Sequence, residues 1–443
     1  MEETVLSFVA GLDTIGGNIV SIQHGNYRIL TDFGAQVGAS IPDQLDGSLT
    51  SHLIERDRLP RLDGVYPHVT VQDIADLQAF EDSEVETIVC LSHLHIDHLG
   101  SLKHISPDIP VFALADAAPF YELLEETSLL PDYGIRIQGV EPEEELEFGP
   151  FNIVFHESDH DAIGAASIFI ECPDLKIVYS GDFRLSGFHP DRVLTWAQKA
   201  RDWQTDLFLI EGTSFSFSNT ELTPEQVAID NLIQEWELQT EGQAQKAFAK
   251  AFVDYTDSCI AFNGYPQNVE RLVTFIQLAH KAGRQVLLQE NMLSLIQPFI
   301  EGMENIAVYH SDKLEAIQSN PGHYAIQVDD QDLSWLEADS KGLYLHSNGT
   351  PLGHYMPEYG EFVQWIVGVG WTFAQAGVSG HAYKEDLLTV AYLVNAQITL
   401  PWHTYNREGY HAALQDRGIA SWMPQLGEQF TASQIVDLTQ ELS

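Results

Sequence analysis

The sequence predicts an α/β protein in which one layered domain is interrupted by a second, doubly wound α/β domain. Three observations lead to this prediction. Apolar, β-rich runs in residues 1–212 end abruptly in polar residues. Strand-like and helix-like segments then alternate over residues 213–369, and short strands followed by polar motifs return over residues 370–443. We therefore expect a first domain built from 1–212 and 370–443 and an inserted domain at 213–369, because a single core usually stops growing at about 250–300 residues.

The first 212 residues are expected to consist mainly of strands. Three apolar or alternating runs, Val5–Gly11, Asn18–Gln23 and Tyr27–Gly34, are separated by turn formers. Four later runs are short and apolar, and each leads the chain directly into polar residues. These four runs are Glu86–Ser92, Phe151–Ser158, Leu175–Phe183 and Leu207–Phe215.

The segment after residue 213 has a different pattern. Glu221–Gln239 is expected to form one amphipathic helix with a proline in its first turn. Ser258–Gly264, Asn268–Gly283 and Gln285–Gln289 follow as strand, helix and strand. The alternation continues to Gly368, so this region is predicted to be a small doubly wound parallel sheet.

The composition favours a soluble protein and argues against a strong binder of polyanions. The formal net charge is −44, from 65 acidic and 21 basic side chains. A field of this sign repels nucleic acids and anionic membranes at long range, although the Debye length at physiological salt is only about 8 Å. We interpret the acidity mainly as an adaptation for solubility or for a salty or acidic environment. The N-terminus is unlike a signal peptide and no apolar run has membrane-spanning length, so a cytoplasmic location is expected.

A histidine-rich motif, HLHIDHLG, directly follows the strand-like run that ends at Ser92. His93 and His95 point the same way along an extended segment, because side chains alternate with a period of two. The turn that follows brings Asp97 and His98 round to the other side. Such a motif can hold two metal ions at the separation of about 3.5–4 Å that two-metal hydrolases use. Imidazole and carboxylate ligands suit zinc best, and manganese or iron also fit.

Later strand-like runs end in the further ligands that a two-metal site needs. FNIVFHESDH offers His156 and His160, and LKIVYSGD ends in Asp182, which is well placed to bridge two metals. AQITLPWH follows the same pattern and ends in His403. The predicted metal ligands are His93, His95, Asp97, His98, His160, Asp182 and His403.

Taken in order, these motifs resemble those of the metallo-β-lactamase superfamily. TDFG, HLHIDHLG, SDHDAIGAAS and YSGDF are similar to its successive motifs. EGTSF, GVSGHA and LPWHT are similar to the additional motifs of its β-CASP branch, which includes ribonuclease J and the endonuclease of messenger-RNA 3′-end processing. The resemblance covers nearly the whole chain. It implies an αββα metallo-β-lactamase sandwich interrupted by a β-CASP domain, with the active site between them.

The resemblance divides the seven ligands into two sets that share one carboxylate. It implies a first metal on His93, His95 and His160, a second metal on Asp97, His98 and His403, and a bridge at Asp182.

The resemblance also implies roles outside the metal ligands. His381 in SGHA matches the histidine that faces the scissile phosphate, where it stabilises charge or protonates the leaving oxygen. Ser379 and the backbone of Gly380 are expected to hold a non-bridging oxygen. Glu211 and Asp32 match acidic residues that orient the metal site from behind its ligands, and Asp32 can equally be a turn-forming aspartate before glycine.

These features predict a metal-dependent hydrolase. A metal-generated hydroxide, hydrogen-bonded to Asp97 or Asp182, would attack phosphorus, so the first hypothesis is a phosphodiesterase or nuclease acting on RNA or short oligonucleotides. The second hypothesis is a hydrolase of a small ester, thioester or lactone. A catalytically silent scaffold is the third, and the intact ligand set argues against it. His381 and the inserted domain favour phosphodiester chemistry, whereas the acidity favours a small substrate.

Two features outside the ligand pattern leave alternatives open. The motif at His160 reads HDAIGA where ribonuclease J has HSIP-like residues, so the ligand is kept but its neighbours differ. In GYPQNVERL, Arg271 either touches substrate or is an ion-paired or solvated helix residue, with Asn268 as the expected helix cap. The sequence is also compatible with a homo-oligomer.

Overall fold

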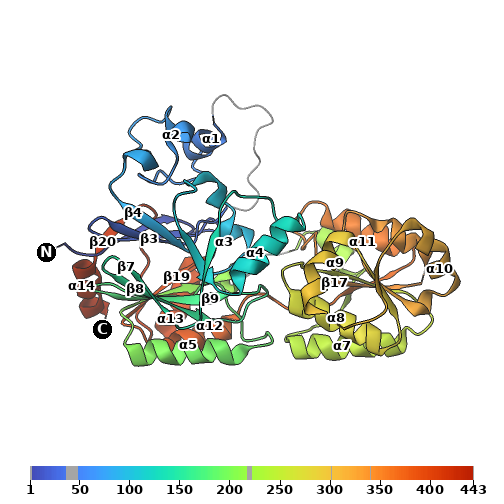
Figure 1. Cartoon of the computed structure of the whole chain (residues 1–443). Coiled ribbons are helices and arrows are strands. Elements are labelled where there is room, and N and C mark those ends of the chain that lie inside the picture. Colours follow the sequence, from blue (N-terminus) through green and yellow to red (C-terminus); the bar gives the residue numbers. More distant parts are fainter. Residues whose placement is uncertain (1, 36–47, 217–221, 301, 340, 443) are drawn as a thin grey trace.

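The computed structural model describes residues 2–35, 48–216, 222–300, 302–339 and 341–442. These residues form two lobes that lie side by side, with both chain ends on the larger lobe (Figure 1). The larger lobe contains two mixed β-sheets, and the smaller lobe contains a third sheet in which all neighbouring strands are parallel.

The first sheet has the strand order β20-β1-β2-β3-β4-β5-β6. Its strands are β1 (Val5–Ala10), β2 (Ile19–His24), β3 (Tyr27–Thr31), β4 (Glu86–Cys90), β5 (Val111–Leu114), β6 (Ile137–Val140) and β20 (Gln429–Thr431). The second sheet has the order β19-β11-β10-β9-β8-β7. Its strands are β7 (Glu145–Phe148), β8 (Phe151–Glu157), β9 (Ala166–Glu171), β10 (Lys176–Tyr179), β11 (Leu207–Glu211) and β19 (Ile398–Trp402).

The two sheets pack face to face and helices cover their outer faces. Phe8 and Ile22 of the first sheet share one buried cluster with Phe155 and Ile168 of the second. The outer face of the second sheet packs against α5, α12 and α13, where Trp196 is fully buried. Helices α1 and α4 lie on the other side of the first sheet (Figure 1). The helices of this lobe are α1 (Leu49–Glu55), α2 (His68–Val71), α3 (Ile96–Leu99), α4 (Ala117–Glu126), α5 (Pro190–Trp203), α12 (Lys384–Val394), α13 (Arg407–Asp416) and α14 (Ala432–Leu442).

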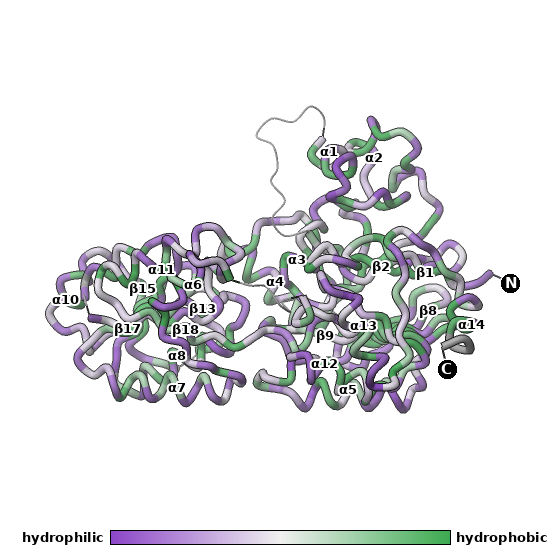
Figure 2. Tube along the Cα trace, turned by 180° about the vertical axis from the view of Figure 1, so that it is seen from behind, coloured by the Kyte–Doolittle hydropathy of each residue, from purple (hydrophilic) through white to green (hydrophobic). Residues whose placement is uncertain are grey.

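The smaller lobe is a doubly wound sheet with the order β12-β18-β17-β13-β16-β14-β15. Helices α7, α8 and α9 contribute buried residues to one face, and α6, α10 and α11 contribute to the other. Hydrophilic and hydrophobic residues alternate along α7, as expected for a helix with one face on a sheet (Figure 2). The strands are β12 (Gln234–Glu235), β13 (Ile260–Gly264), β14 (Gln285–Leu288), β15 (Ile306–Val308), β16 (Tyr324–Gln327), β17 (Leu343–Ser347) and β18 (Thr372–Gln375). The helices are α6 (Pro224–Asp230), α7 (Glu241–Asp254), α8 (Val269–Lys281), α9 (Glu290–Ile296), α10 (Leu314–Ser319) and α11 (Tyr359–Gly368).

This arrangement confirms the predicted fold class, an αββα sandwich with an α/β insertion. None of the helices in the described ranges is long and apolar enough to span a bilayer.

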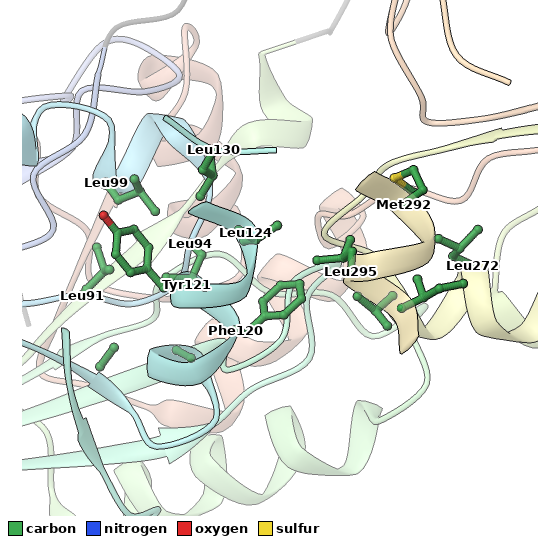
Figure 3. Packing of buried hydrophobic residues seen from close by; sticks show 14 of the residues in the cluster. Leu91, Leu94, Leu99, Phe120, Tyr121, Leu124, Leu130, Leu272, Met292 and Leu295 are labelled. Carbon is green, nitrogen blue, oxygen red and sulfur yellow. The ribbon is translucent and has the colours of Figure 1, made fainter. Parts of the chain in front are cut away.

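An apolar contact joins the two lobes. Phe120 and Leu124 of α4 belong to the same buried cluster as Leu272 of α8 and Met292 and Leu295 of α9 (Figure 3). Protein interiors are close-packed, so a shared core of this kind fixes the position of one lobe against the other.

The predicted helix Glu221–Gln239 is wrong in its second half. Residue 221 lies outside the described residues. The start is confirmed, because Thr223 forms a capping box with Gln226 and a proline occupies the first turn of α6. The helix ends at Asp230, and residues 234–235 instead form β12, which pairs with β18. Backbone pairing with the sheet therefore overrides the apolar periodicity of this segment.

The second expected domain boundary lies just before strand β18. Strand β18 begins at Thr372, after the expected boundary at 369/370, and it pairs with β17 of the third sheet. A short apolar run before a polar motif occurs in both lobes, so the sequence pattern does not say which sheet the strand joins. The division into 1–212, 213–369 and 370–443 stays a prediction.

Candidate metal centre

The seven predicted ligands all follow the carboxyl ends of strands in the larger lobe. His93 and His95 come after β4, and His95 is the N-cap of the short helix α3, which carries Asp97 and His98. The other three ligands follow β8, β10 and β19 in the same way. They are His160, Asp182 and His403. The structure brings the seven side chains together as two groups whose ligand atoms lie within 4.8 Å of one another.

The first ligand set consists of His93, His95 and His160. His160 Nε2 lies 3.1 Å from His95 Nδ1, and His160 Nδ1 lies 2.5 Å from the carbonyl oxygen of Gly380. Because Nδ1 donates to that carbonyl, Nε2 presents a lone pair to the other imidazole. His93 Nε2 is buried and has no hydrogen-bond partner among the described residues. Burial lowers the pKa of His160 to about 3, so the ring is neutral and suited to bind a cation.

The second ligand set consists of Asp97, His98, Asp182 and His403. His98 Nε2 lies 3.1 Å from Asp182 Oδ2, and His403 Nε2 lies 3.2 Å from Asp97 Oδ2. Burial lowers the pKa of His98, but the carboxylates of Asp182, Asp97 and Asp32 outweigh it and hold this pKa well above its usual range. Buried carboxylates thus exceed the available positive charge here, and a divalent cation would neutralise them.

Asp182 lies between the two sets. Its Oδ2 atom is 3.9 Å from His93 Nε2 of the first set as well as 3.1 Å from His98 Nε2 of the second. Burial raises the pKa of Asp182, but the neighbouring His403 and His98 hold it well below its usual range, so the carboxylate is ionised. This placement is the one that a bridging ligand requires.

Asp32 contacts a predicted metal ligand directly. It is fully buried, and its Oδ2 accepts hydrogen bonds from His98 Nδ1 at 2.8 Å and from the Tyr179 hydroxyl at 2.5 Å. Its Oδ1 accepts from the Ser92 backbone N–H at 2.6 Å. The φ angle of 59° places Asp32 in the left-handed region, which aspartate tolerates better than most residues. The carboxylate therefore turns His98 so that Nε2 faces the centre.

Glu211 reaches a metal ligand only through a neighbour. Its Oε2 accepts a hydrogen bond from the Thr213 backbone N–H at 2.9 Å, and Thr213 Oγ1 lies 2.8 Å from His403 Nδ1. The other carboxylate oxygen lies 3.5 Å from His381 Nδ1. Glu211 is thus shared between a ligand and His381, whereas the sequence suggested a contact with the metal ligands alone.

His381 lies at the open side of the centre. Its Nδ1 is 3.6 Å from Asp182 Oδ2, and its side chain is 25% exposed. Burial lowers the pKa of His381, but Glu211, Asp182 and Asp161 outweigh it and raise this pKa to about 9. Together with Asp97, which is 15% exposed, His381 marks the side from which a substrate can approach.

The predicted roles of Ser379 and Gly380 in holding substrate stay predictions. The Ser379 hydroxyl donates to the His381 carbonyl at 2.9 Å and accepts from the His381 backbone N–H at 3.1 Å. Gly380 is buried, and its carbonyl accepts from His160. The Gly380 carbonyl thus ties this loop to a metal ligand, a contact that the spacing of GVSGHA could not show.

Several residues at the centre were missed from the sequence. Ser92 precedes the motif HLHIDHLG, and Thr213 lies in the motif EGTSF. Their places in the sequence could therefore have marked them as neighbours of the metal ligands. Asn18 Nδ2 lies 3.3 Å from His98 Nε2, and no pattern pointed to it. Asp161 Oδ1 lies 3.4 Å from His160 Nε2. His156, offered as an alternative ligand, instead packs on Phe169.

The donor atoms therefore fit a pair of divalent metal ions. The first set offers neutral imidazoles with orphaned nitrogens, and the second offers two ionised carboxylates with two imidazoles. Imidazole nitrogen with carboxylate oxygen is the donor combination of zinc hydrolases.

Comparisons with known proteins agree with the geometry. Residues 13–214 match the family model described as the metallo-beta-lactamase superfamily. Ribonuclease J from Pyrococcus abyssi is 18% identical over 295 residues, which are 63% of this chain and 57% of that protein. The chain thus spans little more than half the length of this curated relative.

Two crystal structures are also similar to this chain. A protein of unknown function from Enterococcus faecalis V583 is 26% identical with a TM-score of 0.80, covering 97% of this chain and 100% of its own. The metallo-beta-lactamase fold protein YhfI from Bacillus subtilis is 17% identical over 48% of this chain and 72% of its own, and its TM-score of 0.29 is too low to support an argument.

The chain therefore carries a metallo-β-lactamase domain, and the resemblance to this superfamily and to its β-CASP branch is confirmed. This domain carries a cluster of histidines and aspartates suited to divalent metal ions.

Proposed function

We propose that this protein is a two-metal phosphodiesterase that cleaves RNA or short oligonucleotides, with zinc in both positions. The observation that carries the proposal is the contact of His381 with the carboxylate shared by both ligand sets, at 3.6 Å from Asp182. Two divalent ions held by these ligands would activate water at neutral pH and would offset charge on the phosphoryl oxygens. The weak similarity to ribonuclease J supports an RNA substrate.

The chain's own residues then have defined tasks. Asp97 and Asp182 are ionised and accept hydrogen bonds, so either can orient the attacking group. His381 is held protonated by Glu211 and lies on the open side, where it can donate to the leaving oxygen. The two lobes are proposed to be the metallo-β-lactamase and β-CASP domains, with the substrate entering between them.

A second candidate is a hydrolase of a small ester, thioester or lactone. The observation that favours it is the net charge of −44, with only 21 lysines and arginines in 443 residues. A long RNA would find few cationic contacts and would release few counterions on binding. For this reason we propose short oligonucleotides rather than long RNA as the better substrates.

The test compares end-labelled long RNA, a short oligonucleotide, a small bis-phosphodiester and a small thioester across a salt series. We expect the short phosphodiesters to be cleaved at least as fast as long RNA at low salt, with added salt neutral or helpful. Turnover of the thioester alone would replace the phosphodiesterase proposal with the second candidate. Tight binding of long RNA that collapses as salt rises would instead indicate a cationic track and a processive ribonuclease.

A further inference from the structure

Four charged side chains form a buried ion cluster beside the metal centre: Asp159, Arg184, Glu241 and Arg271. Each is at most 2% exposed. Arg184 Nε donates to Asp159 Oδ1 at 3.2 Å, and Arg184 Nη1 donates to Glu241 Oε1 at 2.9 Å. Arg271 Nη2 donates to the same Glu241 oxygen at 2.6 Å. The sequence left Arg271 open between substrate contact and ion pairing, and the structure places it in an ion pair.

The buried ion cluster connects the two lobes. Asp159 and Arg184 follow strands β8 and β10 of the larger lobe, whereas Glu241 begins α7 and Arg271 lies in α8 of the smaller lobe. Burying charges costs several kcal/mol per ion, which pairing offsets only when the geometry is good. Apolar contacts such as Phe120 with Phe299 already join the lobes. The cluster is therefore not needed merely to join the lobes, and its contacts indicate another role.

The two arginines of the cluster hold consecutive carbonyl groups of one loop. Arg271 Nη2 donates to the Val378 carbonyl at 2.9 Å, and Arg184 Nη1 donates to the Ser379 carbonyl at 3.3 Å. Asn348 Nδ2 also donates to the Val378 carbonyl, at 2.6 Å. The next carbonyl in the chain, that of Gly380, accepts the hydrogen bond from His160 Nδ1.

This loop thus contacts a ligand of the first metal position and also carries His381. Its Gly380 carbonyl fixes which nitrogen of His160 faces the first metal position, and its next residue is His381, which faces Asp182. Glu241 keeps the two guanidinium groups together, because one carboxylate accepts from both. Asp159 precedes His160 in the chain and is itself bound to Arg184.

We propose that Arg184, Glu241 and Arg271 are positioning residues that set the loop Val378–Gly380, and through it the first metal position and His381. The inference rests on the proposed two-metal function, but part of it concerns metal binding alone. Loss of the cluster should weaken the first metal and slow turnover, and should leave the second metal in place.

The test uses Arg271→Lys, which keeps the charge but lacks the planar fork that reaches both Glu241 and Val378. The matched control is Arg284→Lys, because Arg284 is also a buried arginine of the smaller lobe that donates to backbone carbonyls, here those of Ser258 and Tyr324. Both variants should lose thermal stability. Only Arg271→Lys should bind the zinc ion of the first metal position, on His93, His95 and His160, about 10-fold or more weakly in a competitive chelator titration, the usual scale for an outer-shell contact.

A second variant avoids disturbing the buried charges. Asn348→Gly removes one hydrogen bond to the Val378 carbonyl and keeps the left-handed backbone, since φ at Asn348 is 63°. It should weaken the first zinc less than Arg271→Lys does, and its kcat should fall while KM stays near the wild-type value.

The kinetics test the proposed function, and the zinc titration tests the positioning role, so either proposal can be contradicted without the other. If the wild-type chain cleaves no phosphodiester, the proposed function fails, while the titration still tests the positioning role. If Arg271→Lys and Asn348→Gly both bind two zinc ions with wild-type affinity, or if Arg284→Lys weakens the first zinc equally, the positioning role is overturned.

Discussion

The two ligand sets of the centre differ in charge and in the groups that contact their rings from behind. The first set is three neutral histidines, and its His95 has an Nε2 atom with no hydrogen-bond partner in the described part of the chain. The second set includes two carboxylates, and both of its imidazoles are fixed from behind, His98 by Asp32 and His403 by Thr213. Ligands delivered by the same kind of strand end therefore do not give two equal metal sites. We expect the second position to bind its metal more tightly and to keep it longer against a chelator.

The largest effect is expected from removing Asp182, the residue that both ligand sets share. Asp182→Ala should reduce the metal content from about two ions per chain to less than one and abolish turnover, because both positions lose a ligand. Metal analysis of the purified variant checks this, with Asp202→Ala on the exposed surface as the control. Full occupancy in Asp182→Ala would remove Asp182 from the bridging role.

His381 tests whether catalysis can be separated from metal binding. His381→Ala should retain both metals and slow phosphodiester cleavage by about 10²–10⁴, the usual range for a positioned acid–base group. The measurement pairs metal content with single-turnover kinetics. A variant that turns over like the wild type, or one that has lost metal, would contradict the assignment.

Asp32 tests the support of the second set. Asp32→Asn should keep the fold, because asparagine tolerates the left-handed φ of 59°. The second metal should bind about 10–100-fold more weakly, since the charged partner of His98 is lost, and the first metal should be unaffected. A chelator titration resolves the two equivalents. If the first metal weakens instead, the two sets are assigned in the wrong order.

The smallest effect on metal affinity is expected from Thr213, which contacts the second-set ligand His403. Thr213→Val removes the hydroxyl that bonds His403 Nδ1 and keeps a similar side-chain shape. A neutral hydrogen bond contributes about 1 kcal/mol, so we expect the second metal to bind about fivefold more weakly. The same titration measures this. An effect as large as that of Asp32→Asn would mean that the threonine does more than orient the ring.

Much of the centre could be predicted because its ligands follow strand ends that are visible in the sequence. His93, Asp182 and His403 each follow a short apolar run, and the structure places all of them at one edge of the sandwich. The fold class was predicted for the same reason, since the strand and helix alternation of the insertion is regular.

The features that were missed depend on contacts between distant segments. The helix beyond Asp230 failed because β12 gains its place only by pairing with β18, which lies far along the chain. The contact of the Gly380 carbonyl with His160 was not predicted, because sequence spacing does not show where a loop folds back. The buried pairing of Arg271 with Glu241 likewise joins two helices that carry no joint signature.

The return of the chain to the larger lobe has a consequence for biosynthesis. Strand β19 pairs with β11, and His403 directly follows β19. Strand β20, near the C-terminus, pairs with β1, near the N-terminus. On the ribosome, the histidines of the first set are all made once residue 160 has been added, whereas His403 follows only after the whole smaller lobe. At about 5–20 residues per second, this delay lasts roughly ten to fifty seconds. During that time β11 and β1 present unpaired edges, which are prone to aggregate. The nascent chain therefore passes through a period in which it can neither complete its second metal position nor close its sheets.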